Sequence, residues 1–182
     1  MHPPADPADL LLDIERRCQR HAAALPQPTR PERTIDTGIG FLFAGLEMVA
    51  AMSEISEILA VPRLSKVPGV KPWVCGIANL RGRLLPIYDI DLLCGHERDR
   101  TVQQREQRVL VTECSGQYSG FMVSRIFGMK PMDPDRFESN TPAAPSVLSS
   151  CIEGFYRNGE QTWLRLSLHR LAAAPALQQL AR

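Results

Sequence analysis

Two close pairs of titratable residues are the positions whose types and spacing could do acid–base chemistry. Asp89 and Asp91 are two positions apart, and Glu97 directly follows His96. General acid–base catalysis needs such groups to converge with a further acid, base or nucleophile, and neither pair belongs to a recognisable catalytic set. We interpret the two aspartates as the solvated side of a strand and the second pair as the solvated start of a loop. The sequence therefore predicts no enzyme.

The cysteines are the other candidates for chemistry, as nucleophiles or metal ligands. They are scattered and contain no Cys-x-x-Cys pair, a pattern typical of reduced thiols that fill a core. Cys18 lies near His21, and Cys94 lies near His96. A structural zinc site needs four ligands, and no further pair completes either set. We therefore expect no metal, nucleotide or other cofactor. The five cysteines are Cys18, Cys75, Cys94, Cys114 and Cys151.

Arg81 is the residue whose setting indicates recognition instead of catalysis. It lies in the run Asn79-Leu80-Arg81-Gly82-Arg83, where polar and turn-forming residues predict that a hairpin reverses. Asparagine and glycine permit the left-handed backbone of a tight turn, and a guanidinium on such a turn offers five donors to a carboxylate or a carbonyl group. The alternative is a solvated hairpin arginine with no partner, and spacing alone favours that alternative.

Composition limits the classes of partner. Of the 182 residues, 44% are apolar and 23% are charged, and 21 Lys+Arg against 20 Asp+Glu leave a net charge of +1. This balance, without a basic block, argues against nucleic acid or an anionic lipid surface as the main partner. No apolar run reaches the roughly 18 residues of a membrane-spanning helix. We expect a cytoplasmic protein with no direct membrane insertion.

The elements that position the candidate residues begin after about residue 38, where the composition changes. Residues 1–38 hold six of the fifteen prolines and predict a helix followed by a linker. An Asp-Pro pair gives a typical helix start, apolar residues recur at helical spacing from Leu11 to Leu25, and Pro26 ends the pattern. We expect this N-terminal helix to dock on the protein's own body, and the alternative is a helix offered to a partner.

From Ile39 onward the chain consists of short apolar runs separated by glycine and proline, which predicts an all-β body. An approximate internal repeat appears when Gly76 is laid on Gly154, at an offset of 78 residues. Residues 45–58 likewise overlie residues 116–129 at an offset of 71. A longer loop in the second copy explains the difference between the two offsets. The body is therefore expected to contain two similar halves.

Each copy of about 60–70 residues is long enough for a five-stranded closed sheet. We expect one domain over residues 39–172, made of two five-stranded β-barrels packed together. The first barrel is expected mainly over 39–97 and the second mainly over 107–172, with a C-terminal tail at 173–182. The alternative is a single larger barrel.

The strand after the predicted turn indicates how the barrels meet. Alternate residues from Leu84 to Leu92 are apolar and share one side, with Asp89 and Asp91 on the opposite side. From Leu84 to Tyr88 both sides are apolar, and a strand covered on two faces lies between layers. We therefore expect an apolar interface that makes the two barrels one unit.

Residues 73–90 carry a family resemblance. Their sequence, Trp-Val-Cys-Gly-Ile-Ala-Asn-Leu-Arg-Gly-Arg-Leu-Leu-Pro-Ile-Tyr-Asp-Ile, resembles the signature stretch of the CheW family of chemotaxis coupling proteins. The run Ile-Ser-Glu-Ile at residues 55–58 and its spacing to Gly76 also match that family, and the resemblance extends over about residues 38–172. The stretches 10–25 and 38–41 are similar to the branch of the family found in type IV pilus twitching-motility systems.

The resemblance implies a non-catalytic adaptor of two SH3-like barrels, which couples a CheA-type histidine kinase to a methyl-accepting chemoreceptor. Roles in partner contact pass by motif match to Arg81 and Glu57. Their neighbours follow: Ile55, Asn79, Leu80 and Gly82. In the second copy Ser124 stands where the family commonly has an aspartate, and Arg165 interrupts a strand that is usually more apolar. The resemblance therefore assigns no contacts to the second barrel. It also implies recruitment to receptor arrays at the membrane.

The alternative outside signalling is a small-barrel module that binds nucleic acid or a ligand. A barrel that binds nucleic acid shows aromatic and basic residues interleaved on one strand face. Only 6% of the residues here are aromatic, and that pattern is missing. We therefore expect no nucleic-acid partner.

Overall fold

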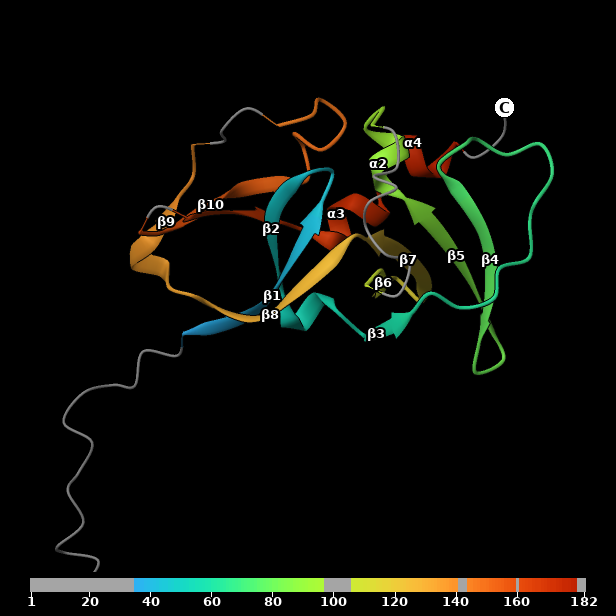
Figure 1. Cartoon of the computed structure of the whole chain (residues 1–182), viewed down its shortest axis with the longest axis horizontal. Helices are drawn as coiled ribbons and strands as arrows, with labels where there is room; N and C mark the ends of the chain where they lie inside the picture. Colours follow the sequence, from blue (N-terminus) through green and yellow to red (C-terminus); the bar gives the residue numbers. More distant parts are fainter. Residues whose placement is uncertain (1–34, 97–105, 141–143, 160, 180–182) are drawn as a thin grey trace, which may run out of the picture. The chain divides into compact units, whose positions relative to one another are not determined.

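Strands make up most of the regular structure in the described part of the chain (Figure 1). The computed structural model describes residues 35–96, 106–140, 144–159 and 161–179, all within one compact unit, Ile35–Arg182. The expected all-β class is confirmed. The expected N-terminal helix lies outside the described residues. None of the helices within the described ranges is long and apolar enough to cross a membrane.

The strands form two curled sheets (Figure 1). The six-stranded sheet contains β1 (Asp36–Phe43), β2 (Leu46–Ala51), β8 (Arg125–Met132), β9 (Phe137–Glu138), β10 (Ile152–Asn158) and β11 (Gln161–Leu166). The five-stranded sheet contains β3 (Glu57–Ala60), β4 (Val74–Leu80), β5 (Arg83–Asp89), β6 (Arg108–Cys114) and β7 (Gln117–Val123). Across the sheets the strand orders are β8-β1-β2-β11-β10-β9 and β3-β6-β7-β5-β4.

Each sheet takes strands from both copies of the repeat. In the five-stranded sheet β5 pairs in parallel with β7, where Ile87 lies opposite Gly120. In the six-stranded sheet β11 pairs in parallel with β2, where Leu164 lies opposite Met48. The expectation of one barrel per half of the sequence is therefore wrong. Alternation of apolar residues identifies equivalent strands in the two copies. The alternation does not depend on which copy supplies the neighbouring strand, so it cannot predict the pairing.

The predicted offset of 78 residues is visible in the backbone. Gly76 in β4 and Gly154 in β10 have φ angles of 143° and 152°, and each lies at a register shift within its hairpin. A Cβ on Gly76 would lie 2.6 Å from the carbonyl oxygen of Ser65, and one on Gly154 would lie 2.4 Å from that of Glu138. Both glycines are therefore required where the backbone of another segment approaches closely.

Short helices follow the last strand of each copy. In the described residues these are α2 (Ile90–Leu93), α3 (Leu168–Ala172) and α4 (Pro175–Gln178), besides the 3-10 turns η1 (Met52–Glu54) and η2 (Pro134–Arg136). Asp89 caps α2 and Ser167 caps α3, at equivalent positions of the repeat. Ala174 and Leu177 belong to the buried core. The chain from 173 to 178 is therefore part of the folded body, whereas we expected a C-terminal tail outside the domain at 173–182.

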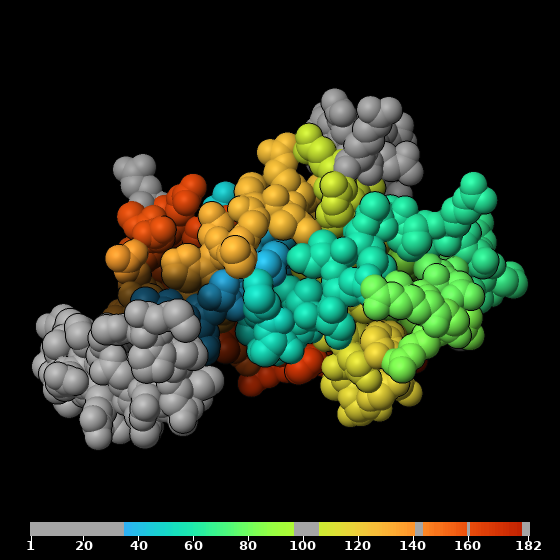
Figure 2. Space-filling view, turned by 90° about the horizontal axis from the view of Figure 1, so that it is seen from below, coloured from blue at the N-terminus to red at the C-terminus, as the bar shows by residue number. Residues whose placement is uncertain are grey.

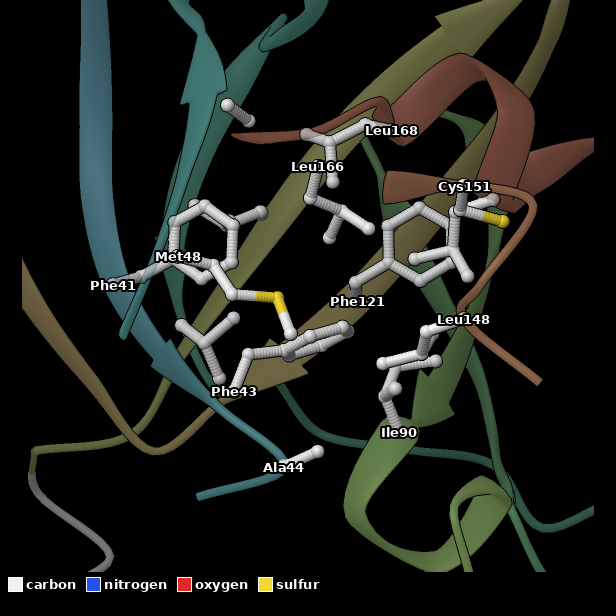
Figure 3. Packing of buried hydrophobic residues seen from close by; sticks show 14 of the residues in the cluster. Phe41, Phe43, Ala44, Met48, Ile90, Phe121, Leu148, Cys151, Leu166 and Leu168 are labelled. Carbon is white, nitrogen blue, oxygen red and sulfur yellow. The ribbon is translucent and has the colours of Figure 1, made fainter. Parts of the chain in front are cut away.

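The largest apolar cluster joins the two sheets (Figure 3). Phe41 and Phe43 of β1, from the six-stranded sheet, and Phe121 of β7, from the five-stranded sheet, are fully buried in it. The centres of the Phe121 ring and the Tyr88 ring on β5 are also 6.0 Å apart. Smaller clusters fill the interior of each sheet. The shared core makes the two sheets one packed unit.

Strand β5 ends at Asp89, although the alternation of apolar residues predicts a strand that continues to Leu92. Leu85 and Ile87 are fully buried inside the five-stranded sheet, whereas Leu84, on the side expected to be buried, is 73% exposed. Asp89 is only 2% exposed, and its Oδ1 accepts a hydrogen bond of 3.2 Å from the backbone N–H of Leu92. The predicted solvated face is wrong, because an N-cap aspartate starts a helix too short for its periodicity to be recognised.

Candidate partner-binding site

A two-residue turn between β4 and β5 carries Arg81. Leu80 and Arg83 pair across the hairpin, and Arg81 and Gly82 have φ angles of 51° and 84°, as a type I′ turn requires. The backbone N–H of Gly82 donates to Oδ1 of Asn79 at 2.8 Å. The asparagine therefore caps the turn, and Arg81 itself adopts the left-handed conformation. Because that conformation costs an ordinary residue about 1–2 kcal/mol, the strand pairing on both sides must hold it in place.

Arg81 forms an ion pair with Glu57, the first residue of β3. Nη2 of Arg81 lies 2.9 Å from Oε1 of Glu57, and the two side chains are 79% and 28% exposed. β3 and β4 are the two edges of the five-stranded sheet, so the curl of the sheet brings the pair together. The structure thus joins the two residues with the strongest motif match. The guanidinium remains open to solvent on most of its surface.

A groove of about 380 Å³ borders this ion pair. Figure 2 shows the green β4–β5 hairpin exposed between the teal surface around β3 and the yellow β6–β7 surface. The groove combines two cations with one carboxylate, an apolar wall and an aromatic ring. Its lining residues are Ser56, Glu57, Leu80, Arg81, Arg83 and Tyr118.

A second polar cluster at the groove was not predicted from the sequence. Nη1 of Arg83 donates to the hydroxyl of Tyr118, and that hydroxyl donates to Oε2 of Glu113 at 2.6 Å. The hydrogen bond to Glu113 raises the pKa of Tyr118. Ser115-Gly116, at φ angles of 53° and 77°, is a turn signal that could have placed Glu113 opposite Tyr118. Arg83 lies close to Tyr118 because β5 pairs with β7, and no local sequence pattern predicts that pairing.

The remaining predicted site residues lie in three places: the groove, the turn and the core. Leu80 lines the groove beside Arg81 and Glu57, and Asn79 and Gly82 build the turn. Ile55 does not line the groove. Its side chain is half-buried and packs against the core between the sheets. Ile55 therefore packs the chain just before β3 against the core, on the side away from the groove.

Asp91 and Cys94, considered as candidates for chemistry, lie in surroundings that favour a structural role. The carboxylate of Asp91 accepts from the backbone N–H of Ala44 at 2.7 Å and from Oγ of Ser124 at 3.3 Å, and burial raises its pKa. Burial, followed by the charge of Asp91, raises the pKa of Cys94 to about 11. Such a thiol is protonated at neutral pH and is a poor nucleophile.

Of the two sequence pairs considered as metal ligands, only Cys94 with His96 lies within the described residues. Within the described residues no three His, Cys, Asp or Glu side chains are grouped so that they could hold a metal ion. His96 is exposed at the end of the first copy. Cys18, His21 and Glu97 lie outside the described residues.

Comparison with known proteins identifies the family. The family model described as CheW-like domain matches residues 37–176. The chain is 42% identical to Protein PilI of Pseudomonas aeruginosa over 166 residues, which cover 91% of each chain. It is 30% identical to the chemotaxis protein CheW of Helicobacter pylori over 88 residues, which are 48% of this chain and 52% of that protein.

A solved structure shares the fold. The crystal structure of scaffolding protein TtCheW from Thermoanaerobacter tengcongensis matches with a TM-score of 0.69 at 21% sequence identity, covering 82% of this chain and 100% of that chain. The family model spans both sheets and includes Arg81 and Glu57. The chain therefore belongs to the CheW-like family.

Proposed function

We propose that this chain is a non-catalytic adaptor that couples a chemoreceptor to a CheA-type histidine kinase and controls type IV pilus twitching motility. Family membership supports a chemosensory role, since the relatives are named chemotaxis proteins, a scaffolding protein and PilI. The observation that carries the contact site is the exposed ion pair between Arg81 and Glu57 on a rigid turn. One of the two partners binds there.

The ion pair is suited to exchange with a partner. An exposed pair of this kind stabilises the free protein by only about 0–1 kcal/mol, so a partner's carboxylate can replace Glu57 at little cost. Once an interface excludes water, the same guanidinium makes a stronger charge-assisted contact. Leu80 and the ring of Tyr118 add apolar surface beside it. The groove therefore combines specificity with reversibility.

The shared core gives a physical basis for coupling. Because both sheets contribute to one buried cluster, a partner bound at the five-stranded sheet keeps a fixed geometry relative to the rest of the folded body. Receptor state can then bias kinase activity through the assembly, without chemistry on the adaptor itself. In this proposal the protein is cytoplasmic and is recruited to receptor arrays by binding.

Reconstitution tests the proposal. Kinase autophosphorylation is measured with receptor-bearing vesicles, with and without this chain, together with co-sedimentation of the chain. We expect receptor-dependent control of the kinase only when the chain is present, and co-sedimentation only with receptor or kinase. A kinase that responds equally without the chain would contradict the adaptor role.

The site is tested with two charge reversals in the same assay. Arg81→Glu should abolish most of the receptor-dependent control. Arg63→Glu makes the same change of charge on another exposed arginine of the same half and should retain full control. Equal control by both variants would remove Arg81 from the partner surface while leaving the adaptor role intact.

A further inference from the structure

The six-stranded sheet contains a pocket that the proposed function does not use. Its volume is about 210 Å³, roughly the share of seven liquid water molecules. The floor is apolar and buried, and consists of Val49, Tyr156 and Trp163. The rim is mainly basic, and its charged residues are Lys130, Arg136, Arg157 and Asp133. An apolar floor beneath a few polar groups is the usual form of a small-molecule site.

The equivalent place in the five-stranded sheet is filled. By the repeat offsets, Leu85 stands there at the position of Trp163 and Leu59 at the position of Lys130. The pairing registers of the strands agree with this equivalence. Leu85 is fully buried in an aliphatic cluster, and Leu59 packs against it. The pocket is therefore specific to the six-stranded sheet, which carries the aromatic ring and the lysine.

The two rim arginines already have partners. Nε of Arg136 lies 3.6 Å from the carboxylate of Asp133, and its Nη1 donates to Asn158 at 2.8 Å. Nε of Arg157 lies 3.4 Å from the carboxylate of Glu138. These contacts fix the arginines at the rim, and they leave positive charge in excess there.

Lys130 differs from the arginines. Its Nζ lies 4.4 Å from the centre of the Trp163 ring, and no carboxylate within the described ranges forms an ion pair with it. An ammonium over an aromatic face is attracted by the ring's electron density, and it keeps the capacity to bind an anion. Lys130 thus supplies a charge at the boundary between the basic rim and the apolar floor.

We propose that this pocket binds a small carboxylate with a flat apolar body, of the size of an aromatic acid such as benzoate. The carboxylate pairs with Lys130, whose ammonium lies over the Trp163 ring, and the body lies in the remaining space beside Val49 and Trp163. Both of those residues lie on the β2–β11 pair that joins the two copies, where Val49 is opposite Arg165. A ligand bound here therefore contacts the strand pair that joins the two copies and not the Arg81 groove.

Benzoate is the probe, and the full-length protein is titrated with it. The indole N–H signals of Trp163 and Trp73 are followed by two-dimensional NMR. We expect saturable shifts of the Trp163 signal, with a dissociation constant that is roughly millimolar or tighter for a ligand of this size. The Trp73 signal serves as an internal control and should stay in place.

Neutral and inorganic probes separate the two parts of the ligand. Benzamide has the same body without the charge, and phosphate has charge without an apolar body. Each should bind at least tenfold more weakly than benzoate. Benzamide binding as tightly as benzoate would show that charge plays no part, and phosphate binding as tightly would show that the body plays none. Either result overturns the proposal.

A matched pair of lysine variants tests the assignment of Lys130. Lys130→Met should weaken benzoate binding at least tenfold. Lys71→Met is the control, because Nζ of Lys71 also lies over a tryptophan ring, 5.6 Å from the centre of Trp73, away from the pocket. Unchanged affinity in Lys130→Met, or no Trp163 shift in the native protein at 10 times the expected dissociation constant (roughly 10 mM), contradicts the proposal. Neither result depends on the adaptor role.

Discussion

The β4–β5 and β10–β11 hairpins occupy equivalent places in the two sheets, but they present different chemistry. In the first, Arg81 projects from the turn and pairs with Glu57 on β3. At the repeat offsets the corresponding positions in the second copy are Gly159 and Gly128, which carry no side chain. The duplicated backbone therefore provides two similar frameworks, and a few side chains decide which of them can make a charged contact.

The junctions between the copies show a similar contrast. At one junction Glu54 accepts from Oγ of Ser167 at 2.9 Å and from the backbone N–H of Leu168 at 2.7 Å. At the other, Asp91 accepts from Ser124. Both carboxylates belong to the first copy, but one follows β2 and the other lies in α2. The same architecture is thus closed by different polar contacts at its two junctions.

Truncation of the shared core should have the largest effect on both copies. Phe121→Ala removes a fully buried ring from the cluster between the sheets, and it should lower the free energy of unfolding by about 3–5 kcal/mol. Urea unfolding is followed through the separate NMR signals of Trp73 and Trp163. Because strands are exchanged, both signals should be lost in one transition. Separate transitions would show that the copies fold independently.

Removal of the Glu54 carboxylate should weaken one junction selectively. Its side chain is 18% exposed, and Glu54→Ala leaves two donors without their acceptor, which should cost about 1.5–3 kcal/mol. Ser53→Ala, at the exposed neighbouring position, is the control and should change stability by less than about 0.5 kcal/mol. Equal effects of the two variants in urea unfolding would mean that the junction contacts contribute nothing.

The other junction should show a dependence on pH. Burial, with the nearby charge of Asp89, raises the pKa of Asp91 above its ordinary value of 3.8. The folded state then binds a proton more readily than the unfolded state, so this group's contribution to stability falls as pH rises from 3.8 through the raised pKa.

Asp91→Asn keeps an oxygen that can accept from Ala44 and removes the titration. Urea unfolding of both proteins is compared from acid to neutral pH. The stability of the native protein minus that of Asp91→Asn should decrease through this window and then level off. A difference that is constant or increases with pH would contradict the assigned direction of the shift.

The repeat and the turn were accessible from sequence because both have local signals. Gly76 and Gly154 marked the correct offset, and the residues around Gly82 marked the hairpin. Roles in partner contact for Arg81 and Glu57 came only from the family resemblance. The contact between these two residues was not predicted, because β3 and β4 meet through the curl of the sheet. The contact of Tyr118 with Arg83 was not predicted, because it follows from the parallel pairing of β5 with β7 between the copies.

Two errors have a common physical origin. The strand through Leu84 was extended past Asp89, because a four-residue helix is too short to replace alternation with helical periodicity. The barrels were assigned to separate halves, because similar copies offer similar partners for every strand. Sequence patterns report which face of an element is buried. They do not report which neighbour buries it.

In the proposed function Arg81 contacts a partner and does not merely stabilise the turn. Three proteins are titrated against kinase and receptor fragments: Arg81→Glu, Arg63→Glu, and the double variant Glu57→Arg with Arg81→Glu, which restores the ion pair in reverse. Circular dichroism should show all three folded. Arg81→Glu should weaken binding of one partner at least tenfold, about 1.4 kcal/mol, and Arg63→Glu should bind normally.

The double variant decides between the two roles. If Arg81 only holds β3 against the hairpin, the reversed ion pair restores the turn and the affinity together. If Arg81 contacts the partner, a glutamate in its place still meets the partner's acidic or carbonyl groups, and binding stays weak. We expect binding at least tenfold weaker in both variants that carry Arg81→Glu. Native affinity for both partners in Arg81→Glu, or full recovery in the double variant, would contradict it.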